Sequence, residues 1–370
     1  MTRSLVLLPG DGIGPEVVAA ADVVLQAVCR RFDHRIDTRR YPMGGAALRA
    51  GLTVYPDETR AACLEGVPVL LGAVGDPAFD HLPRDQKIET GLLALRSSMG
   101  VYANLRPARA WEGLEDATPF KPQRTAGTDL IIVRELLGGL YFGEPRGIAA
   151  DGRSAFNTMR YSEDEVVRVA RVAFALARGR SRRLLSVDKA NVLETSQLWR
   201  RVVTALAADY PEVSLEHQYV DAFAMNLALN PTRYDVVLTE NLFGDILSDE
   251  AAVLAGSLGM LPSASLGERR TEHGTFGLYE PIHGSAPDIA GQDRANPIGT
   301  ILSAAMLLRL SLGCEDAAAA VEAAVSEALD HGWRTSDLAD PARTDDGLVV
   351  VGTTAFGTAV VDRLVAAVSA

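Results

Sequence analysis

The sequence predicts an α/β protein, because short apolar runs alternate along the chain with longer segments of 3.6-residue periodicity. Its 370 residues, 48% hydrophobic and 23% charged, can bury a large core and suggest two or three domains. No internal repeat or low-complexity linker interrupts the alternation. A domain boundary is therefore expected where the chain crosses from one lobe to another.

The expected elements follow from these two patterns. Five short apolar runs predict buried strands at residues 5–8, 67–72, 130–133, 184–187 and 236–238. Longer periodic segments predict helices at residues 15–30, 89–96, 162–178, 196–208, 241–254, 297–310 and 315–330. Residues 111–128 and 262–279 are rich in turn-forming residues and are expected to be irregular, with an exposed hairpin or loop at 267–277.

Charge and cysteine usage exclude several classes of partner. The net charge is −12 and no block of Lys or Arg offsets it, which argues against nucleic-acid and anionic-membrane partners. Cys29, Cys63 and Cys314 are far apart and are expected to be reduced thiols. The apolar part of the N-terminus is too short for a signal peptide, and no run is long enough to span a membrane. We therefore expect a soluble cytoplasmic protein.

A glycine-rich turn follows the first expected strand. Gly10, Gly12 and Gly14 are followed by Pro15, so the spacing fails the dinucleotide-binding fingerprint of a standard Rossmann fold. Proline is common in the first turn of a helix. Three closely spaced glycines still predict a tight turn whose backbone approaches a ligand.

Two carboxylates are expected to stack on one helix face. Asp245 and Asp249 are four residues apart in an apolar run, and this spacing costs a few tenths of a kcal/mol unless a positive group lies between them. Two carboxylates suit a hard cation such as Mg²⁺. A solvated helix face is the alternative interpretation of the pair.

Three arginines predict a site for a substrate with two carboxylates, since guanidinium groups bind carboxylates in bidentate fashion. Arg96 lies in an expected helix, Arg106 precedes a proline, and Arg134 ends a buried strand. Leu92 and Leu93 are positioned to contact an apolar substituent of the substrate, although core packing is the alternative.

Further polar residues lie in segments typical of ligand sites. Tyr141 lies among glycines, and Lys189 follows a strand at the end where α/β proteins place their ligands. Asp221 offers a third carboxylate for the cation.

Together these segments resemble the isocitrate/isopropylmalate dehydrogenase family, the β-decarboxylating dehydrogenases of 2-hydroxy acids. The resemblance covers nearly the whole chain, and the matching segments fall in the family's order. They include LPGDGIGPEV, GLLALR, ANLRPA, SVDKANVLE, NLFGDILSDEAAVLAG and EPIHGSAPDIAG. The resemblance implies a two-lobed open α/β sandwich of this family's type, not a Rossmann fold. It implies a cofactor lobe of residues 1–101 and 260–370, and a dimerisation and metal/substrate lobe of residues 102–259.

The resemblance also implies roles for individual residues. Tyr141 and Lys189 are the implied catalytic acid and base. A small-molecule substrate would contact Glu89, Leu92, Leu93, Arg96, Arg106, Arg134 and Asp221. Mg²⁺ or Mn²⁺ would be held by Asp221, Asp245 and Asp249. NAD would contact Ile13, Asp76, Glu89, His283, Gly284, Ser285, Ala286, Pro287, Asp288 and Asn296. The family further implies a homodimer with shared active sites, in which Lys189 and Asp221 come from the second copy.

The implied reaction is oxidative decarboxylation of a 3-substituted malate, with 3-isopropylmalate of leucine biosynthesis first. Homoisocitrate, D-malate or tartrate, and other 3-alkylmalates are alternatives, as is a non-catalytic regulatory subunit. Asp288 would repel a 2′-phosphate, which favours NAD over NADP. The chain departs from the family at Lys87-Ile88, Asp76 and Phe79, which leaves the specificity for the substrate's side chain open.

Overall fold

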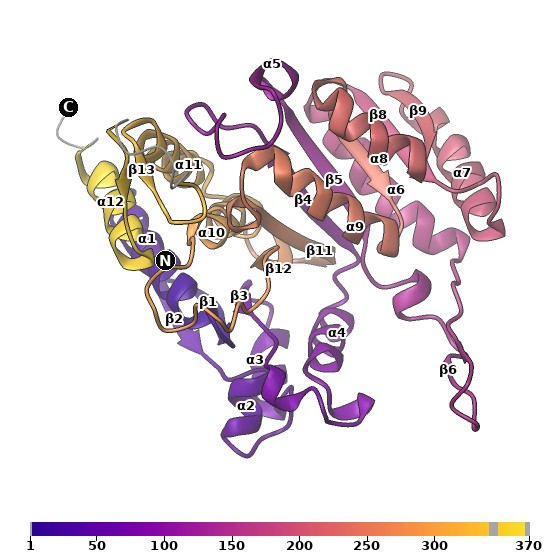
Figure 1. The fold of residues 1–370 in the computed structure, drawn as a ribbon, viewed down its shortest axis with the longest axis horizontal. Coiled ribbons are helices and arrows are strands. Elements are labelled where there is room, and N and C mark those ends of the chain that lie inside the picture. Colours follow the sequence, from indigo (N-terminus) through magenta and orange to yellow (C-terminus); the bar gives the residue numbers. More distant parts are fainter. Residues whose placement is uncertain (1, 340–346, 367–370) are drawn as a thin grey trace. The chain divides into compact units, whose positions relative to one another are not determined.

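The computed structural model describes residues 2–339 and 347–366 and divides the chain into two compact units. Unit 1 comprises Met1–Val101, Trp111–Pro119 and Ala255–Ala370. Unit 2 comprises Tyr102–Ala110 and Phe120–Leu254. Each unit contains a sheet and several helices (Figure 1), which confirms the α/β class expected from the sequence.

Unit 1 is built on five sheet strands. Their order is β2 (Arg35–Arg40), β1 (Thr2–Gly10), β3 (Val69–Ala73), β12 (Thr275–Pro281) and β11 (Pro262–Arg270). Strand β1 is parallel to β2 and β3, and β12 is parallel to β3 but antiparallel to β11. The carboxyl ends of β1 and β3 therefore meet at one edge of the sheet. A separate short pair is formed by β13 (Trp333–Arg334) and β14 (Val349–Val350).

The helices of unit 1 form successive layers. They are α1 (Gly14–Arg31), α2 (Gly45–Arg49), α3 (Asp57–Leu64), α4 (Ile88–Met99), α10 (Ile298–Leu310), α11 (Glu315–Asp330) and α12 (Thr353–Ala366). Short 3-10 turns are η1 (Pro77–Phe79), η2 (Arg84–Gln86) and η7 (Leu258–Met260). Helices α1 and α10 pack on the sheet, and α11 and α12 pack against them. Helix α10 is buried on nearly all sides because its residues are apolar around the whole circumference.

Unit 2 contains the other five sheet strands. Their order is β4 (Ala103–Arg109), β5 (Asp129–Glu135), β10 (Val236–Thr239), β8 (Arg183–Asp188) and β9 (Ser214–Tyr219). Only β4 is antiparallel to its neighbour β5; the other pairs are parallel. All four residues of β10 are buried, as expected for a central strand covered on both faces. A small hairpin is formed by β6 (Gly147–Ile148) and β7 (Ala155–Phe156).

Helices connect the parallel strands of unit 2 and cover both faces of its sheet (Figure 1). Helices α6 (Glu163–Gly179) and α7 (Glu194–Leu206) pack together on one face, and α8 (Val220–Leu229) and α9 (Asn241–Ala252) on the other (Figure 1). The remaining short elements are α5 (Pro122–Thr125), η3 (Gly139–Tyr141), η4 (Ala207–Asp209) and η5 (Pro231–Arg233). Turn η6 (Val253–Ala255) leads from α9 toward unit 1.

The five strands and seven helices expected from periodicity are confirmed, with ends shifted by a few residues. The irregular structure expected for residues 262–279 is wrong, because β11 and β12 occupy most of it, although the hairpin expected near its tip is confirmed. Ser263 and Ser265 are buried there, and the Ser263 hydroxyl donates to the Glu280 carbonyl at 2.9 Å. The first five residues of β11 are all buried, but two of them are serines, so the segment lacks the continuous apolar run that predicts a buried strand.

The edge strands β2 and β9 were not expected from the sequence. Both alternate exposed and half-buried residues and carry charged side chains, as in RIDTRR of β2. Charges on an edge strand prevent pairing with other chains but remove the apolar signal. Within residues 2–339 and 347–366, no helix has both the length and the apolar character of a bilayer-spanning segment.

Helix α6 begins with a capping box whose contribution to stability is testable. The Ser162 hydroxyl accepts from the Glu165 backbone N–H at 3.3 Å, and the Glu165 carboxylate accepts from the Ser162 N–H at 2.7 Å. We expect Ser162→Ala to lower the free energy of unfolding by about 1 kcal/mol. Urea titration measures the change. Ser97→Ala, at an exposed position inside α4, is the control, and equal effects of the two changes would contradict the prediction.

Candidate active site

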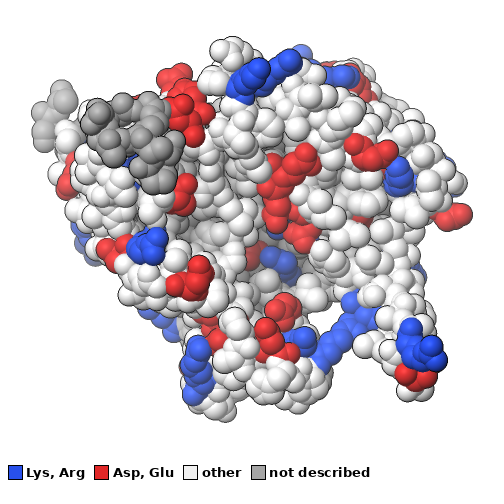
Figure 2. Space-filling view, viewed as in Figure 1, with Lys and Arg blue, Asp and Glu red and all other residues white. Residues whose placement is uncertain are grey.

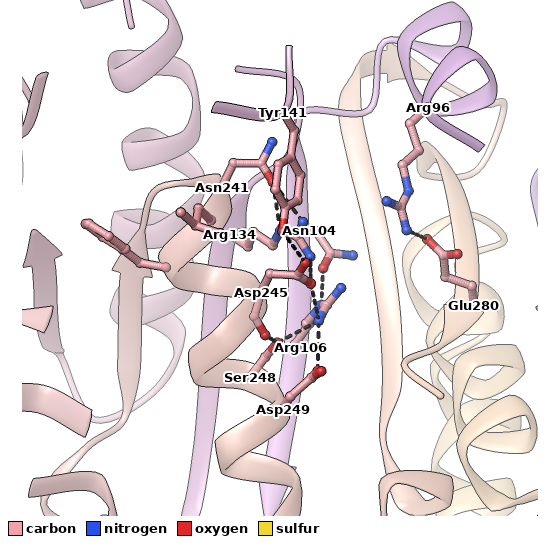
Figure 3. Close-up of polar contacts among 12 residues, drawn as sticks. Arg96, Asn104, Arg106, Arg134, Tyr141, Asn241, Asp245, Ser248, Asp249 and Glu280 are labelled. Atoms are coloured by element: carbon pink, nitrogen blue, oxygen red, sulfur yellow. Dashed lines mark hydrogen bonds and ion pairs between the residues drawn. The ribbon is translucent and has the colours of Figure 1, made fainter. Parts of the chain in front are cut away.

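A buried guanidinium organises the polar cluster of unit 2. Arg134 is 2% exposed, and its Nε and Nη2 donate to Asn241 Oδ1 at 3.0 and 2.8 Å. Its Nη1 forms an ion pair with Asp245 (Figure 3). Burial of a charge requires such partners, so the end of β5 and the first turns of α9 are fixed against each other.

Arg106, another of the three arginines predicted to bind substrate, lies between the carboxylates of Asp245 and Asp249. Arg106 Nη1 lies 3.5 Å from Asp245 Oδ1 and 3.7 Å from Asp249 Oδ1 (Figure 3). Its Nε donates to Asn104 Oδ1 and its Nη1 to Ser248 Oγ, both at 2.6 Å. A cation in this position relieves the repulsion that the four-residue spacing creates on α9.

A glycine allows α9 to approach the strand that carries Arg134. A Cβ at Gly244 would lie 2.7 Å from Arg134 Cγ, closer than side-chain atoms tolerate. The absence of a side chain at this position therefore brings Asp245, the next residue, within reach of the guanidinium.

Tyr141 joins the same cluster from turn η3. Its hydroxyl donates to Asp245 Oδ2 at 2.8 Å, and the Arg134 guanidinium carbon lies 5.6 Å from the centre of its ring. Burial and the bond to Asp245 raise the pKa of Tyr141 to about 12. The phenol is thus protonated at neutral pH, as a general acid must be.

Lys189 and Asp221 form a second group in unit 2. Lys189 Nζ donates to Asp221 Oδ1 at 2.5 Å, and this bond lowers the pKa of Asp221. The preceding residue, Asp188, is buried and accepts hydrogen bonds from Arg200 Nε at 2.8 Å and Arg200 Nη2 at 2.9 Å. The ion pair at Asp188 fixes the end of β8 from which Lys189 projects.

The carboxylates on α9 have the chemistry of a metal site. Within the part of the chain that the structure describes, no three His, Cys, Asp or Glu side chains gather closely enough to hold a metal ion. Asp245 and Asp249 come together on α9, whereas Asp221 contacts Lys189. Burial raises the pKa of Asp249, while Arg106 opposes that shift. Two partly exposed carboxylates fit a hard divalent cation that takes its remaining ligands elsewhere.

Two buried glutamates accept backbone hydrogen bonds next to the cluster. Glu240 accepts from the Leu242 and Phe243 N–H groups at the start of α9. Glu135 accepts from the Leu137 and Gly138 N–H groups, just before η3. Burial raises the pKa of both carboxyls.

The third predicted arginine lies in unit 1. Arg96 donates to Glu280 Oε1 at 2.8 Å (Figure 3), and its Nε is buried without a hydrogen-bond partner. On the same helix, Leu92 and Leu93 are half-buried and lie outside the α4 core residues, while Glu89 is exposed. A buried donor without a partner and two available leucines suit a ligand with both a carboxylate and an apolar part.

One buried carboxylate connects three loops of unit 1. Asp11 accepts from the backbone N–H groups of Gly45, Ala46 and Gly75 at 2.9, 2.7 and 2.9 Å. The neighbouring Gly12 has φ of +56°, and a Cβ there would lie 1.9 Å from the Ser285 carbonyl oxygen. The glycine-rich turn therefore packs directly on the segment that contains Ser285.

Other residues predicted to bind the cofactor are also in unit 1. Ile13 N–H donates to the Ser285 carbonyl at 2.8 Å, and Ile13 packs with Ala286 and Ala295. His283 Nδ1 lies 2.9 Å from the Gly284 carbonyl, while its Nε2 is buried without a partner. The unpartnered His283 nitrogen and the glycine-rich turn around Ile13 fit a bound cofactor.

Some predicted cofactor residues have structural partners of their own. Asp76 accepts from the Ala78 N–H at 3.1 Å and pairs with Arg49, whose guanidinium lies 5.8 Å from the Phe79 ring centre. The Asn296 side chain accepts from the Ile298 N–H at 2.9 Å and donates to Asp337 at 3.0 Å. Pro287 and Asp288 are exposed.

Surface charge is mixed rather than concentrated. Figure 2 shows Lys and Arg side chains in separate places on the displayed face, interspersed with Asp and Glu. An anionic ligand therefore has to be recognised by local groups such as Arg106 and Arg134, not by a broad basic surface.

Sequence reasoning missed several residues of the cluster. Asn241 and Glu240 follow a buried strand directly and begin a helix, a position where polar side chains cap helices or bind ligands. Asn104 lies two residues before Arg106 on β4 and thus points to the same face. These positional signals were present in the sequence, but Ser248 had none.

These features define a two-unit α/β protein with a buried cluster of arginines and carboxylates in unit 2. The chain belongs to the isocitrate/isopropylmalate dehydrogenase family, whose profile matches residues 4–360.

Curated relatives and solved structures agree with this assignment. The chain is 53% identical to a 3-isopropylmalate dehydrogenase of Nitratidesulfovibrio vulgaris, over 98% of this chain and 100% of that protein. It is 52% identical to one of Synechococcus elongatus over 100% of both chains. An isocitrate dehydrogenase from Methylococcus capsulatus has a TM-score of 0.84 at 34% identity, covering 98% of this chain and 99% of that one. A beta-decarboxylating dehydrogenase from Thermococcus kodakarensis has a TM-score of 0.76 at 32% identity, covering 99% and 97%.

The raised pKa of Glu135 gives a testable pH dependence. Because the folded chain binds this proton more tightly than the unfolded chain, Glu135 contributes less to stability as pH rises above its ordinary value of 4.5. We expect Glu135→Gln to reduce the decline in the free energy of unfolding from pH 4.5 to neutral pH. Urea titrations across this range measure the slope, and an unchanged slope would contradict the assignment.

Proposed function

We propose that this chain catalyses the NAD-dependent oxidative decarboxylation of (2R,3S)-3-isopropylmalate to 4-methyl-2-oxopentanoate, a step of leucine biosynthesis in the cytoplasm. The observation that carries the proposal is the convergence of Arg106, Arg134 and Tyr141 on Asp245. That cluster lies in a chain 53% identical, over 98% of its length, to a protein named for this activity.

The arginines bind the two substrate carboxylates in this proposal. Arg106 and Arg134 are buried beside α9, where a guanidinium can bind a carboxylate with both forks. Arg96 supports the same role because its buried Nε has no partner and can donate to a ligand. Leu92 and Leu93 contact the isopropyl group, and Glu89 lies beside them on α4.

Asp245 and Asp249 are the proposed ligands for Mg²⁺ or Mn²⁺, with Asp221 supplied by a second copy of the chain. When bound, the cation would polarise the oxygen on C2, which favours loss of the hydroxyl proton and later accepts charge from the breaking carbon–carbon bond. Arg106 Nη1 lies 3.5 Å from Asp245 Oδ1 and 3.7 Å from Asp249 Oδ1, so its charge opposes the repulsion between the two carboxylates.

Lys189 and Tyr141 carry the proton transfers. Lys189 is the proposed base for the proton of the C2 hydroxyl. When bound, NAD⁺ would supply the acceptor for the hydride from C2, and the carboxylate on C3 would then leave as CO₂. Tyr141 donates its proton to C3, where the electron pair remains. The raised pKa of Tyr141 supports this role, because the phenol holds its proton until the carbanion-like centre forms.

NAD is proposed to bind unit 1 at the edge where β1 and β3 end. The proposed contacts are the turn at Ile13, whose N–H donates to the Ser285 carbonyl, and the segment of His283, Gly284, Ser285, Ala286 and Pro287. Further proposed contacts are Asp76, Glu89 and Asn296. Asp288 is exposed and can accept from a ribose 2′-hydroxyl, whereas it would repel a 2′-phosphate.

A homodimer with shared active sites completes the proposal. In unit 2, large apolar side chains are exposed on α8, α9 and the β6–β7 hairpin: Met225, Leu229, Ile246, Ile148 and Phe156. An apolar surface of this kind marks an interface between proteins. Residues 102–259 would then form the dimerisation and metal/substrate lobe, and residues 1–101 and 260–370 the cofactor lobe.

Other 3-substituted malates, including homoisocitrate and D-malate, remain alternative substrates because the residues around α4 set that choice. Lys87 and Glu89 are both exposed there and both can affect binding of a third carboxylate. A non-catalytic regulatory subunit has less support, since such a protein has no physical need to keep Tyr141, Lys189 and paired carboxylates together.

The metal assignment can be tested with Asp245→Asn. Loss of one charged ligand should lower Mn²⁺-dependent turnover by more than about a hundredfold. Differential scanning fluorimetry with and without Mn²⁺ gives a second readout, and the variant should lose the rise in Tm that Mn²⁺ gives the parent enzyme. Asp164→Asn, on the exposed face of α6, is the control. Near-normal activity of Asp245→Asn without excess metal would overturn the assignment.

The substrate assignment rests on burial of the isopropyl group. Each buried CH₂-sized unit contributes roughly 0.8 kcal/mol, so three carbons favour isopropylmalate over D-malate by about 2 kcal/mol, or on the order of thirtyfold in kcat/KM. Leu92→Ala should reduce this preference, whereas Leu52→Ala, at an exposed position of unit 1, should not. Homoisocitrate turned over as well as isopropylmalate would replace the substrate but keep the reaction.

A further inference from the structure

One buried tyrosine lies outside the proposed active site but contacts the segments that carry its residues. Tyr161 is the residue before the Ser162 cap of α6 and is 7% exposed. A Cβ at Gly138 would lie 2.7 Å from the Tyr161 ring, and one at Gly139 would lie 2.5 Å from its hydroxyl oxygen. The ring also packs edge-to-face with Trp199, with centroids 5.5 Å apart. The ring is thus held between a helix residue and a turn that has room only because it lacks side chains.

The hydroxyl of Tyr161 contacts three groups from two segments. It accepts from the Asn241 backbone N–H at 3.0 Å, and it lies 3.3 Å from Glu240 Oε2 and 3.4 Å from Glu135 Oε2. A phenol has a single proton, so it donates to only one of the two carboxylates at a time. The oxygen therefore forms a junction between the two glutamates.

Each glutamate fixes the start of a segment that carries a site residue. Glu240 accepts from two N–H groups in the first turn of α9, the helix of Asp245. Glu135 accepts from the Leu137 and Gly138 N–H groups, just before η3, which ends at Tyr141. Tyr161 is the side chain that contacts both caps.

Few residues along the chain separate these two capped segments from the proposed reacting groups, Tyr141 and Asp245. Tyr141 is three residues beyond Gly138, and Asp245 is five beyond Glu240. The two meet where the Tyr141 hydroxyl donates to Asp245 at 2.8 Å. A shift of either cap changes the alignment of the proton donor with the carboxylate.

We propose that Tyr161 is a positioning residue that holds the turn of Tyr141 in register with α9. It acts through Tyr141 and Asp245 and does not itself touch substrate. This inference rests on the proposed function, because Tyr141 is assigned there as the proton donor.

The test uses Tyr161→Phe in the full-length enzyme with isopropylmalate, NAD⁺ and Mn²⁺. The ring still fills its space, so only the hydroxyl contacts are lost. We expect kcat to fall on the order of tenfold, a part of what a general acid contributes, while KM for isopropylmalate and NAD⁺ changes less than about threefold. The solvent deuterium isotope effect on kcat should increase, because proton delivery becomes slower relative to the other steps.

A matched control separates positioning from packing. Tyr234 is also buried in unit 2, and its hydroxyl donates to Gln218 at 3.3 Å. Tyr234→Phe removes the same atom and should leave kcat and the isotope effect unchanged. If Tyr161→Phe loses activity only in proportion to unfolded protein, measured by circular dichroism, its role is structural and the proposal is wrong.

A double-mutant cycle with Tyr141→Phe decides whether Tyr161 acts through Tyr141. If it does, adding Tyr161→Phe to Tyr141→Phe lowers kcat by less than about twofold further. Fully additive losses would overturn the proposal. The parent enzyme distinguishes failure of the proposed function from failure of the positioning role. If the parent does not turn over isopropylmalate, the proposed function is wrong. If parent turnover is normal and Tyr161→Phe has no effect, only the positioning role is refuted.

Discussion

The buried guanidinium of Arg134 is the constraint on which the rest of the cluster depends. A charge that is 2% exposed would destabilise the fold by several kcal/mol without partners, so the sequence has to supply oxygen acceptors around it. Asn241 supplies one oxygen for two of its nitrogens, and Asp245 supplies the charge. Both acceptors lie on α9, so compensation of one buried charge fixes how that helix lies on β5. The arrangement of Arg106, Tyr141 and the two carboxylates then follows from the position of α9.

Unit 1 uses the opposite charge for the same purpose. The carboxylate of Asp11 accepts three backbone N–H groups from two segments that are separate in the sequence, from Gly45 and Ala46 at the start of α2 and from Gly75 after β3. Loops without apolar side chains have little else to fix them, because their contribution to the core is small. In both units, therefore, a buried charge at the end of a parallel strand replaces hydrophobic packing as the force that orders a binding edge.

Periodicity predicted the α/β class and the main strands and helices because their burial requires long apolar patterns. It failed at β11, where Ser263 and Ser265 are buried, and at β2 and β9, whose exposed positions carry charge. In the cluster, spacing placed Asp245 and Asp249 on one helix face, and the structure adds Arg106 between them. The contacts of Ser248 and Tyr161 bridge residues about 80 to 140 positions apart, and a single sequence contains no local pattern for such pairs.

The contacts of Asp245 explain why a site of flexible side chains can be precise. Arg134 approaches it from β5, Arg106 from β4 and Tyr141 from η3, so three segments determine the position of one carboxylate. The two arginines are held in turn by neutral acceptors: Asn241 accepts from Arg134, and Asn104 and Ser248 accept from Arg106. Asp245 and Asp249 balance the charges of Arg106 and Arg134, so the neutral acceptors orient the two arginines without adding further negative charge beside α9. A carboxylate in place of Asn241 would not satisfy the same hydrogen bonds, because the Asn241 Nδ2 also donates to the Gly138 carbonyl at 3.0 Å and a carboxylate has no proton to donate.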